Sequence, residues 1–461
     1  METNKPQELV ERGLEHSTAD GCVVIVDRSS TANLRWANNN LTTNGVARDS
    51  TVTVVSTVAG STGVAAASLS RSASAVDEVR VLVDRADRAA RDAGPAEDAA
   101  PFVPETVDAA WADAPDTTSI EVLEPLANDL GEAFGRARSE GRRLFGYAEH
   151  DVTTTYVGSS SGLRRRHVQP GGHIGVTGKD ADQRSAWVGQ ATRDFGDVDA
   201  LGLDADLERR LGWAQRSVSL DAGRYDTILP PTAVADLLIY AYWTAGARDA
   251  LDGQTAFARP GGGTRIGERL SERPVTMYSD PAAPGLECSP FVTAHASSSD
   301  SSVFDNGLAL SRTDWIADGE LRALRQTRHS AVLTEQPVTP GIGNLLVDVG
   351  GTSTQPEALA AGMERGLLLT CLWYIREVDA QSLLLTGLTR DGVYLVENGE
   401  ITGSVNNFRF NESPIDLLAR FTDASASAPS FSREWGDEFL RTSTPALRVP
   451  DFNMSSVSQA S

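Results

Sequence analysis

The chain has 461 residues, enough for two or three domains with well-buried cores. Its net charge is −22, and lysine occurs only at positions 5 and 179, so the surface is acidic and repels the phosphates of nucleic acid. No run of about 18 or more apolar residues suggests a membrane span, and the acidic N-terminus is unlike a signal peptide, so we expect a cytoplasmic protein.

The N-terminal half predicts a helix, then strands, then a second helix. Gln7–His16 reads as a short helix, and Cys22–Asp27 reads as a buried strand. Further strands are expected at Leu34–Asn38 and Thr51–Val58, followed by an amphipathic helix at Val76–Asp92 with apolar residues three or four apart. This order predicts an α/β layer with antiparallel pairing.

Residues 93–119 are rich in Ala, Pro and Asp and predict a loop. A helix is expected over Ile120–Glu140, then a hairpin of Leu144–Val157 and Gly162–Val176, and a helix at Ala200–Gln215 that closes the first domain. The dense basic cluster Arg164–His167 either grips an acidic partner or is a solvated strand face, and the second interpretation is the simpler one.

The middle of the chain predicts one helix from Pro230-Pro231 to Gly253, because Pro is tolerated in a helix's first turn. The three cysteines, Cys22, Cys288 and Cys371, are scattered without a CxxC motif, and we expect them to stay reduced.

The stretch from Met363 to Pro414 alternates apolar β-favouring runs with polar turns. Asp391-Gly392 and Asn398-Gly399 are hairpin signals, since Asp, Asn and Gly tolerate positive φ. The run Ser404–Asn411 carries three Asn and an Arg, which suit binding of a peptide or carboxylate. The alternative is an edge strand with a polar outer face.

The segments WYIREVDAQSLLLTGLTRDGVYLVENGEI and VNNFRFNESP resemble the C-terminal signature of the TldD/PmbA (TldE) family, also named for modulation of DNA gyrase. Met277–Phe291, Phe304–Gly307 and Val26–Gly45 fit the same family. The similarity is strong over residues 274–414 and fainter over the first 220. It implies a two-subunit cytoplasmic metallopeptidase for proteolysis, with a zinc-bearing TldD-type chain and a PmbA-type partner.

The resemblance also implies that a zinc-bearing chain carries HExxxH on the helix near residues 227–257. Two registers are possible here, placing either Ile239, Tyr240 and Thr244 or Thr244, Ala245 and Asp249 at the motif positions, and neither supplies a histidine. The family's C-terminal cysteine ligand is also missing from Asn406–Phe421. We therefore expect no cofactor and no metal ligand in this chain, with zinc in a TldD-type partner.

No catalytic centre is visible from the residues themselves. A GxSxG elbow is absent, and nothing around Cys288, His295 or His329 indicates an activated thiolate. The predicted function is a PmbA/TldE-like subunit that helps form the enclosure for an unfolded or extended peptide, with Asn406, Asn407 and Arg409 as substrate-binding residues and no catalytic residue.

Three other functions stay open. The chain is either a stand-alone homodimeric peptide-binding protein, a peptidase with an atypical metal site, or a regulator of a topoisomerase by contact. Binding of nucleic acid and of membrane is not expected.

The predicted fold class is α+β: an N-terminal α/β domain over residues 1–225, with the loop 93–119, then a β-rich, barrel-like antiparallel C-terminal domain over 226–450. A disordered tail is expected over 451–461.

Overall fold

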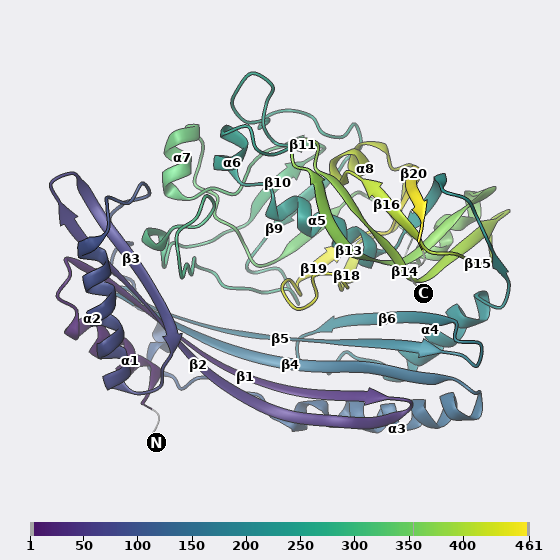
Figure 1. Cartoon of the computed structure of the whole chain (residues 1–461), viewed down its shortest axis with the longest axis horizontal. Coiled ribbons are helices and arrows are strands. Elements are labelled where there is room, and N and C mark those ends of the chain that lie inside the picture. Colours follow the sequence, from purple (N-terminus) through teal and green to yellow (C-terminus); the bar gives the residue numbers. More distant parts are fainter. Residues whose placement is uncertain (1–3, 354, 459–461) are drawn as a thin grey trace.

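The computed structural model describes residues 4–353 and 355–458. Its first sheet is a layer of six antiparallel strands in the order β3-β2-β1-β4-β5-β6, which lies beneath the rest of the chain in Figure 1. The strands are β1 (Gly21–Ala37), β2 (Asn40–Gly60), β3 (Gly63–Ser72), β4 (Arg143–Ser159), β5 (Arg164–Lys179) and β6 (Ser185–Thr192). Asn38 and Asn39 take positive φ at the turn between β1 and β2, as their side chains allow.

Helices cover one face of this sheet in two separate groups. α1 (Pro6–His16) and α2 (Val76–Asp92) pack on one end, around Val24, Val26 and Val54. α3 (Glu124–Ser139) and α4 (Ala200–Trp213) pack on the other end, around Leu34 and Trp36. Because side chains alternate along a strand, the odd-numbered residues of β1 from Asp27 onward point to the opposite, polar face.

A second sheet is made of short strands in the order β11-β10-β9-β12-β19-β18. Their bounds are β9 (Thr276–Ser279), β10 (Thr313–Ala317), β11 (Glu320–Leu321), β12 (Leu345–Asp348), β18 (Ala428–Ser430) and β19 (Thr442–Thr444).

The third sheet closes into a barrel. The path β13-β8-β20-β16-β14 is completed by pairing between β13 and β14, which gives a ring of five strands. Its strands are β8 (Gly223–Leu229), β13 (Arg365–Asp379), β14 (Leu384–Glu397), β16 (Phe408–Glu412) and β20 (Leu447–Val457), and β15 (Glu400–Val405) and β7 (Ser217–Val218) extend it beyond β14. The predicted α+β class with a barrel-like sheet is confirmed.

Helix α5 (Pro231–Trp243) runs through the large core that joins the second and third sheets. Most of its residues are buried, which explains why its sequence is apolar on nearly every side. The remaining elements are α6 (Ala247–Leu251), α7 (Arg328–Thr334), α8 (Pro414–Arg420), β17 (Asp423–Ala424) and the 3-10 turns η1 (Ala109–Ala112), η2 (Ile120–Leu123), η3 (Val303–Asp305) and η4 (Pro356–Gly362). In the part of the chain that the structure describes, no helix has the length and apolar character needed to cross a bilayer.

The predicted helix from Pro230-Pro231 to Gly253 is wrong in its middle. The structure ends α5 at Trp243 and starts α6 at Ala247. Arg325 causes this break: its Nη1 donates to the Trp243 carbonyl at 3.0 Å, and its backbone carbonyl accepts from the Ala247 amide at 2.9 Å. The break between α5 and α6 is thus stabilised by a residue more than 75 positions away in the sequence, which the local pattern does not indicate.

The expected disorder after Asp451 is also wrong for residues 451–457, which form most of β20. Phe452 and Met454 are fully buried inside the barrel, and their alternation with polar residues is the period-two signal of a strand. Residues 459–461 of the expected tail lie outside the described residues.

Candidate functional site

A cleft separates β5 of the first sheet from the loops around the second sheet. Several contacts bridge it. Among them, Gln169 Nε2 donates to the Glu287 carbonyl at 3.2 Å, Arg441 Nη2 donates to the Pro170 carbonyl at 3.0 Å, and the ring of His173 stacks on Phe431 with centroids 5.3 Å apart. The two parts of the chain are therefore held together across a partly open space.

Two cavities lie along this cleft. One of about 380 Å³ is lined by the end of α5 and by the loops near Cys288, Asp305 and Ile342. The other, of about 360 Å³, lies between the ends of β5 and β6 and the strands β18 and β19. Gln169 and Arg441 line both cavities, so these two side chains stand at their junction.

Arg441 places a largely buried guanidinium in the cleft. Burial lowers its pKa, opposed by the nearby Cys288 and Asp151. The only hydrogen bond of its guanidinium among residues 4–353 and 355–458 is to Pro170, and it forms no salt bridge there. Since a guanidinium carries five N–H donors, most of them stay available to a ligand's carbonyl or carboxylate.

The Asp151 carboxyl lies near this guanidinium but does not bond to it. Burial raises the pKa of Asp151, and the charge of Arg441 only partly opposes this effect. Both groups are desolvated, and no ion pair joins them. A polar ligand that hydrogen-bonds to them at the junction of the cavities would therefore gain more binding free energy than on an open surface.

The second cavity also borders two strand edges. Among the described strands, β6 pairs with β5 alone and β18 with β19 alone. Ala191 and Thr192 of β6 and Pro429 and Ser430 of β18 line the cavity wall. An extended chain entering there meets unpaired backbone groups as well as Arg441.

The loop that precedes Arg441 is fastened to α5 by Asp236. This fully buried carboxylate accepts hydrogen bonds from Ser432 Oγ at 2.6 Å, from the Glu434 amide at 3.1 Å and from the Leu372 amide at 3.2 Å. Trp435 Nε1 donates to the backbone carbonyl of Asp236 at 2.8 Å. Burial raises the pKa of Asp236 to about 7.

Residues 222–456 match the family model described as the PmbA/TldA metallopeptidase C-terminal domain, which is more than half of the chain. The chain belongs to the PmbA/TldD family. The fold agrees with three solved structures. TldE from Thermococcus kodakarensis is 16% identical, with a TM-score of 0.76 over 97% of this chain and 99% of that one.

Two proteins named as candidate modulators of DNA gyrase have the same fold. The one from Bacteroides thetaiotaomicron is 14% identical, with a TM-score of 0.74 over 98% of both chains. The one from Thermotoga maritima is 16% identical, with a TM-score of 0.71 over 97% of this chain and 99% of that one. No curated protein matches the sequence.

The metallopeptidase name of the family raises the question of zinc, and the residues of this chain do not fit that ion. α5 and α6 contain no histidine, and the Asp236 carboxylate is already occupied by three protein donors. Within the described ranges, no three His, Cys, Asp or Glu side chains come together in a way that could hold a metal. We derive no step through zinc in this chain.

The cysteines do not supply a nucleophile either. Burial raises the pKa of Cys288, which lines the first cavity, to about 11, and it raises those of Cys22 and Cys371 to about 12. All three are free thiols, and at neutral pH they stay protonated and unreactive.

The predicted substrate-binding residues Asn406, Asn407 and Arg409 lie at the junction of β15 and β16, and none of them lines the two cavities above. Asn406 Oδ1 accepts from the Leu220 amide at 2.8 Å, and Asn407 Oδ1 accepts from Thr389 Oγ1 at 3.2 Å. The Arg409 side chain is exposed, with a long contact of 3.4 Å to Thr386. Arg409 lies in β16, which is not an edge strand, since it pairs with β14 and β20.

The arginines of the basic cluster on β5 form ion pairs with acids that lie beside them in the fold. Arg164 pairs with Glu11 at 2.6 Å, Arg165 with Asp108 at 3.1 Å and Arg166 with Asp116 at 2.9 Å. These guanidiniums are therefore not free to grip an acidic partner. Arg441, which the sequence did not single out, lies in the cleft without a salt bridge to any of the described residues.

Proposed function

We propose that this chain is a PmbA/TldE-like subunit of a TldD/TldE-type metallopeptidase. It lacks the zinc motif and contributes a peptide-binding wall to an enclosure that a zinc-bearing sister chain completes. Two observations together support the proposal. The chain has the C-terminal domain of a metallopeptidase family, and the helix expected to hold the metal has no histidine.

The cleft at Arg441 suits an unfolded peptide better than a compact ligand. A peptide in extended conformation presents backbone donors and acceptors that pair with a strand edge, and the edges of β6 and β18 border the second cavity. A carbonyl or a carboxylate of that peptide takes the unused donors of Arg441. These contacts recognise the backbone and the charge of the peptide, so they should select only weakly for its side-chain sequence.

Asn406, Asn407 and Arg409 enter the same proposal in a lesser role. The exposed guanidinium of Arg409 offers a further contact along the outer surface of the barrel, while the two amides hold the β15–β16 connection in place. Alanine at all three positions should weaken peptide turnover by the assembled pair. Unchanged turnover would remove these residues from the proposal.

The test of the cleft is the affinity for a fluorescently labelled, unstructured peptide, measured by anisotropy. Arg441→Met should raise the Kd about tenfold or more, because a charge-assisted hydrogen bond is worth about 1.5–3 kcal/mol. Arg441→Lys keeps the charge but not the planar fork, so it should restore only part of the affinity. The matched control is Arg85→Met on the exposed side of α2, which should bind like the wild type.

The test of the subunit assignment is zinc content. The isolated chain should contain no zinc, and zinc should appear in proportion to a co-purified TldD-type chain. About one tightly held zinc per isolated chain would contradict the proposal. Peptide binding by an isolated homodimer that never assembles with such a chain would favour a stand-alone binding protein instead.

A further inference from the structure

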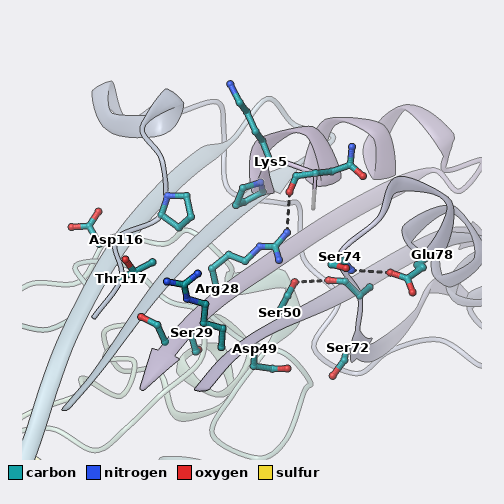
Figure 2. Close-up of a pocket in the computed structure, with 16 residues that line it drawn as sticks. Lys5, Arg28, Ser29, Asp49, Ser50, Ser72, Ser74, Glu78, Asp116 and Thr117 are labelled. Carbon is teal, nitrogen blue, oxygen red and sulfur yellow. Dashed lines mark hydrogen bonds between the residues drawn. The ribbon is translucent and has the colours of Figure 1, made fainter. Parts of the chain in front are cut away.

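A separate cavity of about 700 Å³ opens on the helix-covered face of the first sheet, away from the cleft. Figure 2 shows it bordered by Lys5 just before α1, by Arg28 of β1, by Ser72 at the end of β3 and by Ser74 just after it. The segment that contains Asp116 and Thr117 forms its far side. The cavity thus lies in the gap between the two groups of helices that cover this face.

Arg28 interrupts the apolar pattern on the helix-facing side of β1. The even-numbered positions of β1 face the helices, and they carry Val24 and Val26 before it and Ala32 and Leu34 after it. At position 28, the helix-facing side of β1 carries a half-buried guanidinium instead of an apolar side chain. Burial lowers the pKa of Arg28, so its charge is held in the sheet at an energetic cost.

A second arginine lies next to Arg28. In the β1–β2 register, Arg28 faces Ser50 and Ser30 faces Arg48, so the two arginines are diagonal neighbours on the same face of the sheet. Such diagonal positions are about 7–8 Å apart, within reach of one small ligand for side chains this long. Two like charges at this distance repel each other unless an anion lies between them.

The acids of the cavity are already engaged elsewhere. The Glu78 carboxylate accepts from the amides of Ser74 at 2.8 Å and Ala75 at 3.1 Å. Asp116 pairs with Arg166 at 2.9 Å. Asp49 also lines the cavity, and its charge opposes the lowering of the Arg28 pKa, while its carboxylate accepts from Thr51 Oγ1 at 3.0 Å.

The three cations, in contrast, have no carboxylate partner among the residues that the structure describes. Arg28 donates only to the Asn4 carbonyl, at 3.0 Å, and neither Arg48 nor Lys5 forms a side-chain hydrogen bond or salt bridge in that part of the chain. The lining holds as many acids as cations, so what distinguishes the three cations is that none of them forms an ion pair among the described residues.

Hydroxyl donors complete the lining. The side chains of Ser72, Ser74 and Thr117 border the cavity, and their hydroxyls make no hydrogen bond within residues 4–353 and 355–458. Two guanidiniums, one ammonium and several hydroxyls around one space resemble the donor set that proteins use for phosphate groups. A single carboxylate would leave at least one of the arginines unpaired.

We propose that this cavity is a binding site for a small phosphate-bearing anion, held between Arg28 and Arg48. We expect the ligand to carry two or more negative charges, because it contacts two adjacent guanidiniums at once. The volume accommodates a phosphorylated metabolite rather than a polymer. The site is independent of the peptide cleft, which lies in another part of the molecule.

Isothermal titration calorimetry with inorganic phosphate tests this proposal, using the full chain in a phosphate-free buffer at low ionic strength. The wild type should bind phosphate with a Kd of about 1 mM or tighter, and binding should weaken as salt is added. Arg28→Gln and Arg48→Gln should each raise the Kd about tenfold or more. Acetate, a monoanion, should bind much more weakly than phosphate.

Arg88→Gln is the matched control, because Arg88 is exposed on α2 and its loss changes the net charge equally. It should leave phosphate affinity within about twofold of the wild type, since surface changes of this kind are small. Arg48 is exposed, so its variant keeps the test valid if Arg28→Gln does not fold. Phosphate affinity unchanged in both cavity variants, or no phosphate binding by the wild type up to about 10 mM, would overturn the proposal.

Discussion

Asp236 predicts a measurable dependence of stability on pH. Its carboxylate lies in the core, accepts three hydrogen bonds and has a pKa raised by burial to about 7, compared with 3.8 for an ordinary Asp. Between these two values the folded state binds a proton that the unfolded state does not. The stabilisation by that proton is complete below the unfolded value and is lost as the pH rises through about 7.

The size of the effect follows from the difference between the two pKa values. One pKa unit corresponds to about 1.4 kcal/mol, so Asp236 should lower the free energy of unfolding by about 2.5 kcal/mol between pH 5 and pH 8. Asp236→Asn keeps the shape of the side chain and removes the titration. Its amide NH2 group then faces a backbone donor, so the variant should be less stable than the wild type at pH 5.

The assay is urea unfolding of the wild type and Asp236→Asn at several pH values from 5 to 8. Other buried carboxyls titrate in both proteins and cancel in the comparison. The stability advantage of the wild type should shrink by about 2.5 kcal/mol over this range. Two parallel stability curves would refute the reasoning, because they would show that Asp236 in the folded protein does not titrate between pH 5 and pH 8.

Three further outcomes are expected. Arg142→Met breaks a pair in which both side chains are about 5% exposed, with 2.6 Å between Arg142 Nη1 and Asp204 Oδ1, and should cost about 3–5 kcal/mol in the unfolding free energy. Gly319→Ala should lower the melting temperature, because φ is +76° and an added Cβ would lie 2.0 Å from the Ser271 carbonyl oxygen. All three thiols should resist iodoacetamide at pH 8 in the native protein and react only in denaturant, as mass spectrometry would record.

Local signals in the sequence predict most of the C-terminal sheet. Asn398-Gly399 takes positive φ at the predicted hairpin turn between β14 and β15. The hairpin predicted at Asp391-Gly392 is wrong, because these residues take positive φ within β14, where its register with β13 shifts. Closure of the barrel is different, because it depends on pairing of β13 with both β8 and β14, and β8 is more than 130 residues distant. No local pattern contains that information. The burial of Phe452 and Met454 was visible as an alternation, but it is short and lies in a polar segment.

The candidate sites could be predicted only in part. The lack of histidine on α5 is readable from the sequence, since it concerns residue identity alone. Arg441 and Arg28 are ordinary arginines in the sequence, and what distinguishes them is that neither forms a salt bridge among the described residues of the fold. In contrast, Arg164–Arg166 stand out in the sequence and are neutralised by acids as distant as Glu11.

The position of β20 sets an order of events during synthesis. This strand lies between β8 and β16 in the barrel, yet it is made more than 200 residues after β8. The first sheet is complete at Thr192 and can form on the ribosome, whereas β8 and β16 wait with exposed edges until Leu447–Val457 emerges. Ribosome stalling or proteolysis in this last segment would leave two open strand edges that favour aggregation.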